Sequence, residues 1–145
     1  MTTTEEKQMG RFSIDVDLAN QEDLYDVKKG LLRPEQVRHA RVRGVVDSGL
    51  TRLVLPESVV QQLGLELSGS ANVRYADGRS ANRQIAKNVN LTYGGRESVF
   101  SAIVEPGRES ALIGAIVLEE LDFLIDCING RLVPRDPNQI ISEAE

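Results

Sequence analysis

The stretch that decides the fold is VVDSGLTRLVLP, residues 45–56. An apolar pair, Val45-Val46, leads into Asp47-Ser48-Gly49, and a second apolar run follows at Leu53 to Leu55. A carboxylate at the edge of a core is costly unless it is hydrogen-bonded or takes up a proton. Ser48 supplies a hydroxyl, and Gly49 supplies a bare backbone that another group can approach closely. The tripeptide alone is more typical of a β-turn with Asp at its first position than of a catalytic site.

Segments on either side of this stretch have the patterns of short strands. Arg11 to Leu18 alternates polar and apolar residues, and His39 to Val46 becomes fully apolar at its end. Hairpin signals of two residues stand at Asp77-Gly78 and at Gly94-Gly95. Further strands are predicted over residues 72–76, 79–86, 89–93, 99–104, 111–113, 123–125 and 131–133.

Two compact helices are predicted between the strands. The first runs from Pro56 to Gly64, because Pro favours the first helical turn and Gly favours the stop. The second follows Gly114 and covers about two turns, from Ala115 to Leu121. The polar stretch from Ala19 to Glu35 is expected to be a long excursion, in which a short helix around 21–29 is left open.

Length and composition favour a single β-rich domain. A chain of 145 residues has little room for two domains. Aromatic residues make up only 4% and Trp is absent, so the core must consist of Val, Leu and Ile, which favour strands. The fold class predicted is all-β, a barrel or sandwich with two short helices. We expect residues 1–9 to be a disordered leader, residues 10–136 the folded domain, and residues 137–145 an acidic tail.

Several kinds of site are disfavoured by what the chain contains. With one cysteine, Cys127, and one histidine, His39, an internal disulfide is excluded and a Cys/His zinc site nearly so, and no metal or cofactor is expected. A serine hydrolase is disfavoured because the chain has no Gly-x-Ser-x-Gly elbow. A phosphate-binding loop is disfavoured because Gly94-Gly95 leads into a predicted strand rather than a helix.

Charge and hydropathy bear on partners and location. The net charge is -5, and the small basic group at Arg38, Arg41 and Arg43 has no interleaved aromatic residues. A solvated strand face explains that group better than nucleic-acid binding does. The N-terminus lacks the apolar segment of a signal peptide, and no apolar run approaches the length of a membrane span. We therefore expect no nucleic acid and no membrane as partners, and a cytoplasmic location by default.

Residues 38–134 resemble the retropepsin-like aspartic proteases in the order and spacing of their segments. Residues 45–56 look like that family's active-site segment, in which a strand ends in Asp-Thr/Ser-Gly and a short strand and a helix follow. Ala111-Leu-Ile-Gly114 resembles the second hallmark, two aliphatic residues and a Gly before a short helix beneath the active-site loop. Residues 126–134 resemble the closing hairpin of bacterial members. Leu50 stands where the family usually has Ala, and the excursion over residues 19–35 is longer than in the compact viral enzymes.

The resemblance implies a retropepsin-like acid-protease barrel that cleaves peptide bonds as an aspartic endopeptidase. In that family one carboxylate activates a water, and a second, protonated carboxyl group polarises the scissile carbonyl. The two groups lie so close together that they cannot both be ionised. This chain has one Asp-Ser-Gly, so a homodimer would supply the second carboxylate and a peptide or protein would be the substrate.

The resemblance also assigns roles to residues. Asp47 would be catalytic, with Ser48, Gly49 and Leu50 in the active-site loop, where Ser48 would tie the two loops together. Ile113 and Gly114 would support that loop. The hairpin tip would be the substrate flap, with the residues Tyr75, Ala76, Asp77 and Gly78, although an ordinary exposed hairpin explains any one of them equally well.

Two other functions stay open from the sequence. The first is a peptide-binding or dimerisation module that keeps the retropepsin fold without hydrolysis, which the bulkier Leu50 favours. The second is an unrelated small β-barrel for protein interaction, in which Asp47 is only a turn residue. The three alternatives differ in peptidase activity and in whether two copies bring their Asp47 side chains together.

Overall fold

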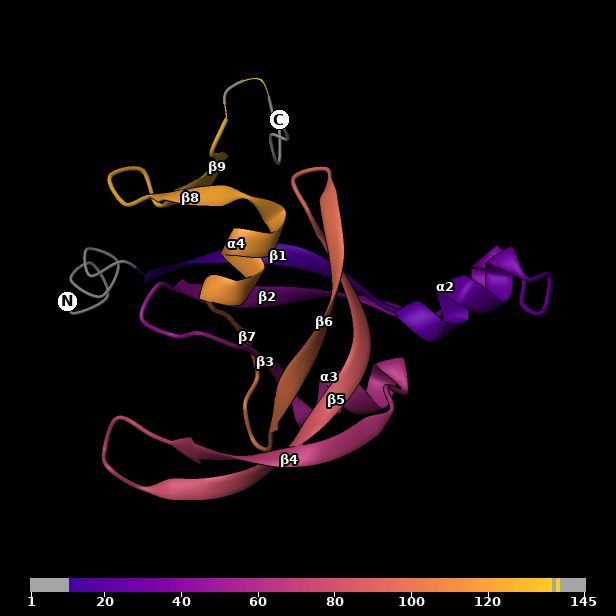
Figure 1. The fold of residues 1–145 in the computed structure, drawn as a ribbon, viewed down its shortest axis with the longest axis horizontal. Helices are drawn as coiled ribbons and strands as arrows, with labels where there is room; N and C mark the ends of the chain where they lie inside the picture. Colours follow the sequence, from indigo (N-terminus) through magenta and orange to yellow (C-terminus); the bar gives the residue numbers. More distant parts are fainter. Residues whose placement is uncertain (1–10, 137, 139–145) are drawn as a thin grey trace, which may run out of the picture.

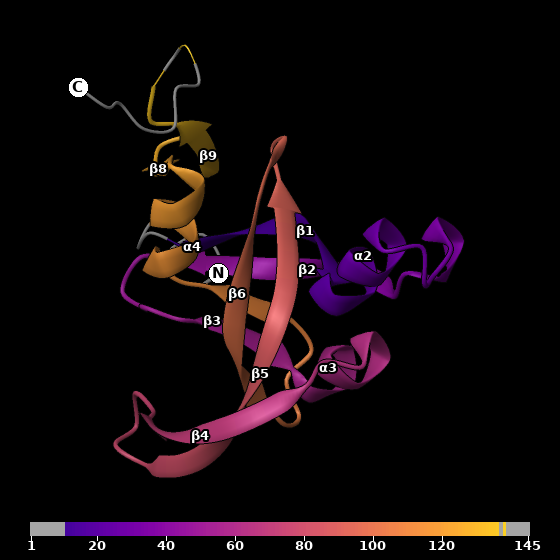
Figure 2. The ribbon, with the colours of Figure 1, turned by 45° about the vertical axis from the view of Figure 1, so that its right-hand side comes forward.

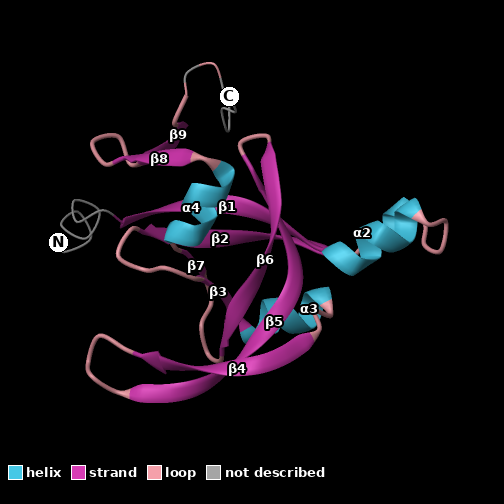
Figure 3. Ribbon diagram, viewed as in Figure 1, coloured by secondary structure: helices cyan, strands magenta, loops and turns pink. Residues whose placement is uncertain are grey.

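The structure is a computed structural model, and it describes residues 11–136 and 138. Within that part of the chain, strands dominate and three short α-helices lie at the periphery (Figures 1 and 3). The predicted leader, residues 1–9, lies outside the described residues, as does the predicted acidic tail except for residue 138. The strands are β1 (Arg11–Asn20), β2 (His39–Asp47), β3 (Leu53–Pro56), β4 (Leu67–Arg74), β5 (Ser80–Tyr93), β6 (Arg96–Glu105), β7 (Ala111–Ile113), β8 (Phe123–Asp126) and β9 (Arg131–Pro134).

Six strands close into a barrel. The sheet order is β1-β2-β7-β3-β6-β5-β4, and β1 also pairs with β5, which joins the two sides of the sheet. Most neighbours are antiparallel, but β2 with β7 and β3 with β6 are parallel. The strand β4 extends from the barrel and pairs with β5 alone, and β8 and β9 form a separate hairpin.

The core explains why the alternating segments form strands. Along β1, Phe12, Val16 and Leu18 point inward, at 7%, 1% and 1% exposure, as the alternation over residues 11–18 predicts. Most of the other fully buried side chains are aliphatic, with Asn20 and Pro56 as exceptions, and the aromatic residues of the core cluster are three Phe residues at 7–8% exposure. Leucine, valine and isoleucine therefore supply the apolar burial that stabilises this barrel.

The hairpins lie where the sequence predicts them, but one turn and one strand differ from the prediction in length. Tyr93 pairs with Arg96 across Gly94-Gly95, both of which have positive φ, so this is the predicted two-residue turn. At Asp77-Gly78 the last strand pair is Arg74 with Ser80, which makes the loop five residues long instead of two. The two strands predicted over 79–86 and 89–93 are one strand, β5, which bends at a bulge where Asn88 takes φ +61°.

Residues 11–136 contain three α-helices, one more than the sequence predicts. The helices α3 (Glu57–Leu63) and α4 (Ala115–Leu121) agree with the prediction, and Gly64 ends α3 in the left-handed conformation. The additional helix α2 (Gln21–Lys28) occupies the stretch that the sequence left open, and a single 3-10 turn, η1 (Pro34–Gln36), follows it. Among the described residues, none of the helices is long and apolar enough to cross a membrane.

Helix α2 is fastened by polar contacts more than by apolar packing. The Asn20 side chain accepts from the backbone N–H of Asp23 at 3.0 Å, which caps the helix. Asp23 is buried and accepts two bonds from the Arg38 guanidinium, each at 2.9 Å. That hydrogen-bonded pair holds the pKa of Asp23 below its usual range. Both views of the ribbon place α2 on the side of the barrel opposite α4 (Figures 1 and 2).

Candidate active site

The candidate site is built where β7 lies between β2 and β3. Val45 and Val46 pair with Leu112 and Ile113, and Leu53 pairs with Ile113 on the other side. The chain therefore leaves β2 at Asp47 and re-enters the sheet at Leu53 on the far side of β7. The intervening loop has to pass over the end of β7, which is where Gly114 begins the turn into α4.

Glycine is required at position 114 by this crossing. A Cβ there would lie 2.7 Å from the carbonyl oxygen of Leu50 and closer still to that of Arg52. The first amides of α4 then bind the loop, with Ala115 donating to the Leu50 carbonyl at 2.7 Å and Ile116 to the Thr51 carbonyl at 2.9 Å. The predicted supports, Ile113 and Gly114, thus lie directly beneath the predicted active-site loop. Ile113 is also 99% buried and packs closely over Gly44.

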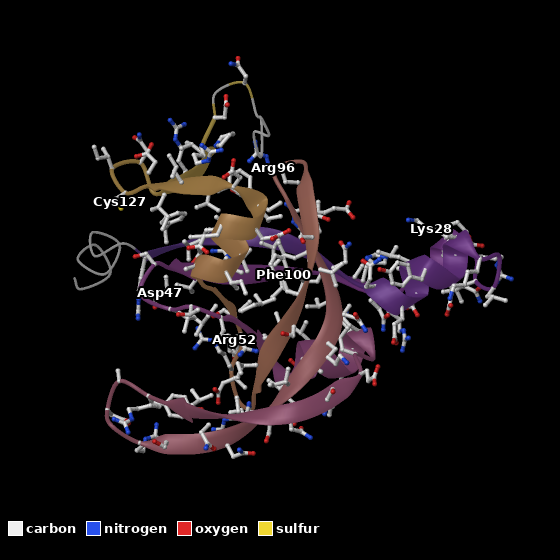
Figure 4. The ribbon with its side chains drawn as sticks, in the orientation of Figure 1. Lys28, Asp47, Arg52, Arg96, Phe100 and Cys127 are labelled. Atoms are coloured by element: carbon white, nitrogen blue, oxygen red, sulfur yellow. The ribbon has the colours of Figure 1, made fainter. Side chains whose placement is uncertain are left out.

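Asp47 has one partner on each carboxylate oxygen. The backbone N–H of Gly49 donates to Oδ1 at 3.0 Å, which holds the side chain over its own loop. The Arg11 guanidinium donates to Oδ2 at 2.9 Å, and the two residues are register partners on β1 and β2. The Asp47 side chain is 20% exposed, and that of Arg11 is 58% exposed. Figure 4 places Asp47 on the side of the barrel away from Lys28 of α2.

The other residues of the loop differ in exposure. Ser48 and Gly49 are exposed and Leu50 is half-buried. A Cβ on Gly49 would meet only Asp47 Oδ1, at an ordinary 3.5 Å, so nothing within the described chain requires a glycine there. Leu50 lies outside the core cluster, and its backbone N–H donates to the Asp47 carbonyl at 3.1 Å. The loop therefore presents a carboxylate, a hydroxyl and a bare backbone to the outside of the molecule.

The candidate flap is the loop between β4 and β5, residues 75–79. Its tip and the Asp47 loop project to the same side of the molecule in both ribbon views (Figures 1 and 2). Ala76, Asp77 and Gly78 are exposed. The backbone N–H and the guanidinium of Arg79 donate to Asp77 at 3.0 and 2.7 Å and hold the pKa of that carboxyl below its usual range.

Tyr75 is hydrogen-bonded to the end of the barrel strand β6. Its hydroxyl lies 2.8 and 2.9 Å from the two carboxylate oxygens of Glu105, and Arg83 Nε donates to the hydroxyl at 2.9 Å. The sequence pointed to Tyr75 but gave no sign of Glu105 or Arg83. It also missed Arg11, although the antiparallel pairing of two predicted strands would have brought that residue opposite Asp47.

The described residues contain no group of three or more His, Cys, Asp or Glu side chains placed to hold a metal ion. The chemistry that the site offers is that of Asp47, a carboxylate on a loop fixed from below. Its backbone is determined by β7 and α4, and its two oxygens are oriented by one amide and one guanidinium.

Comparisons with known proteins identify the family and the fold. The model of the aspartyl protease family matches residues 35–126, which include the Asp47 loop, the hairpin and the Gly114 turn. The fold is similar to that of the EIAV protease complexed with the inhibitor HBY-793, with a TM-score of 0.53 and 13% identity over 85% of this chain and 92% of that one. No curated protein matches in sequence. The predicted retropepsin-like barrel is confirmed, and the chain belongs to the aspartyl protease family.

Proposed function

We propose that this chain is an aspartic endopeptidase whose active site is completed by a second copy of itself. The observation that carries the proposal is the fixed loop that presents Asp47 outward, supported from beneath by Gly114 and the first amides of α4. A carboxylate held this way can take a proton from a water that attacks a peptide carbonyl. The second carboxylate, which holds the shared proton and polarises that carbonyl, would come from the partner copy.

Two features of the loop favour a second copy as the partner. Gly49 is exposed and has free space around it, so its lack of a side chain is best explained by a group that approaches from outside the chain. Ser48 is exposed beside it and has a hydroxyl that can bind the same loop of the partner. A two-fold axis through this point would place both loops face to face.

Arg11 has to move aside in such a dimer, because its guanidinium occupies Oδ2 of Asp47. The Arg11 side chain is 58% exposed, and pairs of this kind contribute only about 0–1 kcal/mol. Breaking the ion pair between Arg11 and Asp47 in each copy would therefore cost little stability before the two loops come together.

Cleavage of unstructured peptides by the full chain tests the proposal. We expect slow cleavage that a pepstatin-type inhibitor blocks, and a rate at least about a hundredfold lower for Asp47→Asn. Asp15→Asn is the matched control, because Asp15 pairs across the same two strands with Arg43, at 3.6 Å. An Asp47→Asn variant that cleaves as fast as the parent and the control would refute a catalytic role for Asp47.

A non-catalytic module that binds peptides or dimerises is the second candidate. It is favoured by Leu50, where the family usually has Ala, and by the ion pair that covers Asp47. This alternative expects a dimer that binds peptide, with no cleavage by the parent and no effect of the inhibitor.

A further inference from the structure

The hairpin of β4 and β5 extends well beyond the barrel. The strand β4 pairs only with β5, and β5 pairs with β6 from Ile85 onward. Residues 67–84 are therefore a two-stranded ribbon, and β4 is mostly exposed along its length. A two-stranded hairpin is only marginally stable by itself in water. Side-chain contacts between the ribbon and the barrel will decide where its tip lies.

One cluster makes such a contact near the tip. The Tyr75 hydroxyl donates to the Glu105 carboxylate, and Arg83 Nε donates both to that hydroxyl at 2.9 Å and to Glu105 Oε1 at 2.8 Å. Glu105 is the last residue of β6 and the register partner of Pro56 in β3, so it belongs to the barrel. The cluster thus connects the loop of the hairpin, through Arg83 in its second strand, to a fixed part of the fold.

The surroundings make this cluster stronger than an ordinary surface contact. The side chains of Arg83 and Glu105 are 28% and 15% exposed, whereas those of the ion pair between Arg79 and Asp77 are 75% and 56% exposed. The Tyr75 ring lies near two guanidinium groups, 5.4 Å from that of Arg79 and 5.8 Å from that of Arg83. Hydrogen bonds to charged groups are stronger than those between neutral groups, and a cation–π contact gains when it is shielded from water, as it is for Arg83 more than for Arg79.

We propose that Tyr75, Arg83 and Glu105 form a latch that holds the flap against the barrel and so positions it for peptide binding. The latch gives Tyr75, which the resemblance assigned to the substrate flap, a role in positioning that flap. The claim that the latch serves peptide binding rests on the proposed function. The claim that it holds the hairpin rests on the contacts alone. A hairpin held in place before peptide arrives loses less conformational freedom on binding.

Hydrogen exchange measured residue by residue tests the latch directly. Two amides report on the loop, the N–H at position 75, which donates to Arg79, and that of Gly78, which donates to Tyr75. In Tyr75→Phe, which keeps the ring and loses the hydroxyl, we expect both amides to exchange at least about fivefold faster. Glu105→Gln, which keeps the shape and loses the charge, should raise the same two rates.

Tyr93→Phe is the matched control for the lost hydroxyl. Tyr93 is the last residue of the same strand, β5, whereas Arg83 lies near its start, and the Tyr93 ring packs edge-on against Phe123 with the ring centroids 5.6 Å apart. We expect the two reporter amides to exchange at the parental rate in this variant. Parental rates in both Tyr75→Phe and Glu105→Gln would overturn the latch.

Peptide kinetics test the role in binding. For Tyr75→Phe we expect KM to rise about three- to tenfold with kcat within about twofold, because the flap must be ordered at the moment of binding. An unchanged KM together with faster exchange would overturn the positioning role. If the parent cleaves no peptide, the proposed function fails while the exchange rates still decide whether the latch exists.

Discussion

The Asp47 loop and the β4–β5 hairpin are held in opposite ways. The loop is short, is flanked by the fully buried Val46 and Leu53, and is bonded from beneath by amides of α4. The hairpin is long, largely exposed, and fastened near its tip by the Tyr75 cluster. Regions with few buried contacts open at lower free energy than core segments do. The proposed chemistry therefore lies on a segment that costs more free energy to open, and the proposed cover lies on one that costs less.

Among changes to the residues that support these two regions, the largest effect should come from Gly114, which lies beneath the Asp47 loop. In Gly114→Ala the new Cβ meets backbone carbonyls of residues 50–52, which cannot rotate away as a side chain would. We expect the free energy of unfolding to fall by about 1–3 kcal/mol and peptidase activity to fall more than about tenfold. Urea denaturation and peptide cleavage measure the two. The control is Gly95→Ala in the β5–β6 turn, where the space around the Cβ is open but φ is +79°. A variant at 114 that is no less stable than this control would show that the loop does not depend on a close backbone approach.

A smaller effect is expected for a change at Leu50. This change tests the contribution of a loop side chain separately from that of the loop backbone. Leu50 is half-buried and outside the core cluster, while its carbonyl is fixed by α4. In Leu50→Ala we expect the free energy of unfolding to fall by only about 1 kcal/mol. We expect peptidase activity to rise severalfold, because a bulky group beside the catalytic loop is removed. Denaturation and cleavage assays on the same preparation check this. Unchanged activity with a loss of about 2–5 kcal/mol would instead make Leu50 a core residue.

The smallest effect concerns the tip of the hairpin and depends on pH. The pKa of Asp77 is lowered by the backbone N–H and the guanidinium of Arg79, so the ionised carboxylate stabilises the folded tip. This contribution is complete above the unfolded pKa, about 3.9, and disappears as the pH falls through the folded pKa below it. We expect the Arg79 amide to gain protection as the pH rises through that acid range, once intrinsic exchange is corrected for. Asp77→Asn should remove this dependence, whereas a parental profile in that variant would place the titrating group elsewhere.

Local signals in the sequence account for most of the fold and for the Asp47 loop and the Gly114 turn, but not for the side chains that bind Asp47 and Tyr75. The caps at Pro56 and Gly64, the alternation over residues 11–18 and the Gly94-Gly95 turn each act within a few residues, so their elements could be predicted. Helix α2 was left open because it has few apolar residues and is fastened by Asp23 and Arg38, fifteen residues apart. The bonds from Arg11 to Asp47 and from Tyr75 to Glu105 join residues 36 and 30 positions apart. Such pairs depend on strand register and on the curl of a hairpin, which no local pattern contains.

The central claim, that one active site needs Asp47 from two copies, is tested most directly by mixing. Parent and Asp47→Asn chains are combined in varying proportion at a fixed total concentration at which sedimentation shows dimer, and are left to exchange subunits before peptide cleavage is measured. If each site needs two Asp47 carboxylates, random pairing at equal proportions leaves about one quarter of the parental activity, and the decline follows the square of the parental fraction. Activity of about one half, falling in direct proportion to the parental fraction, would contradict the shared site and assign any cleavage to single chains.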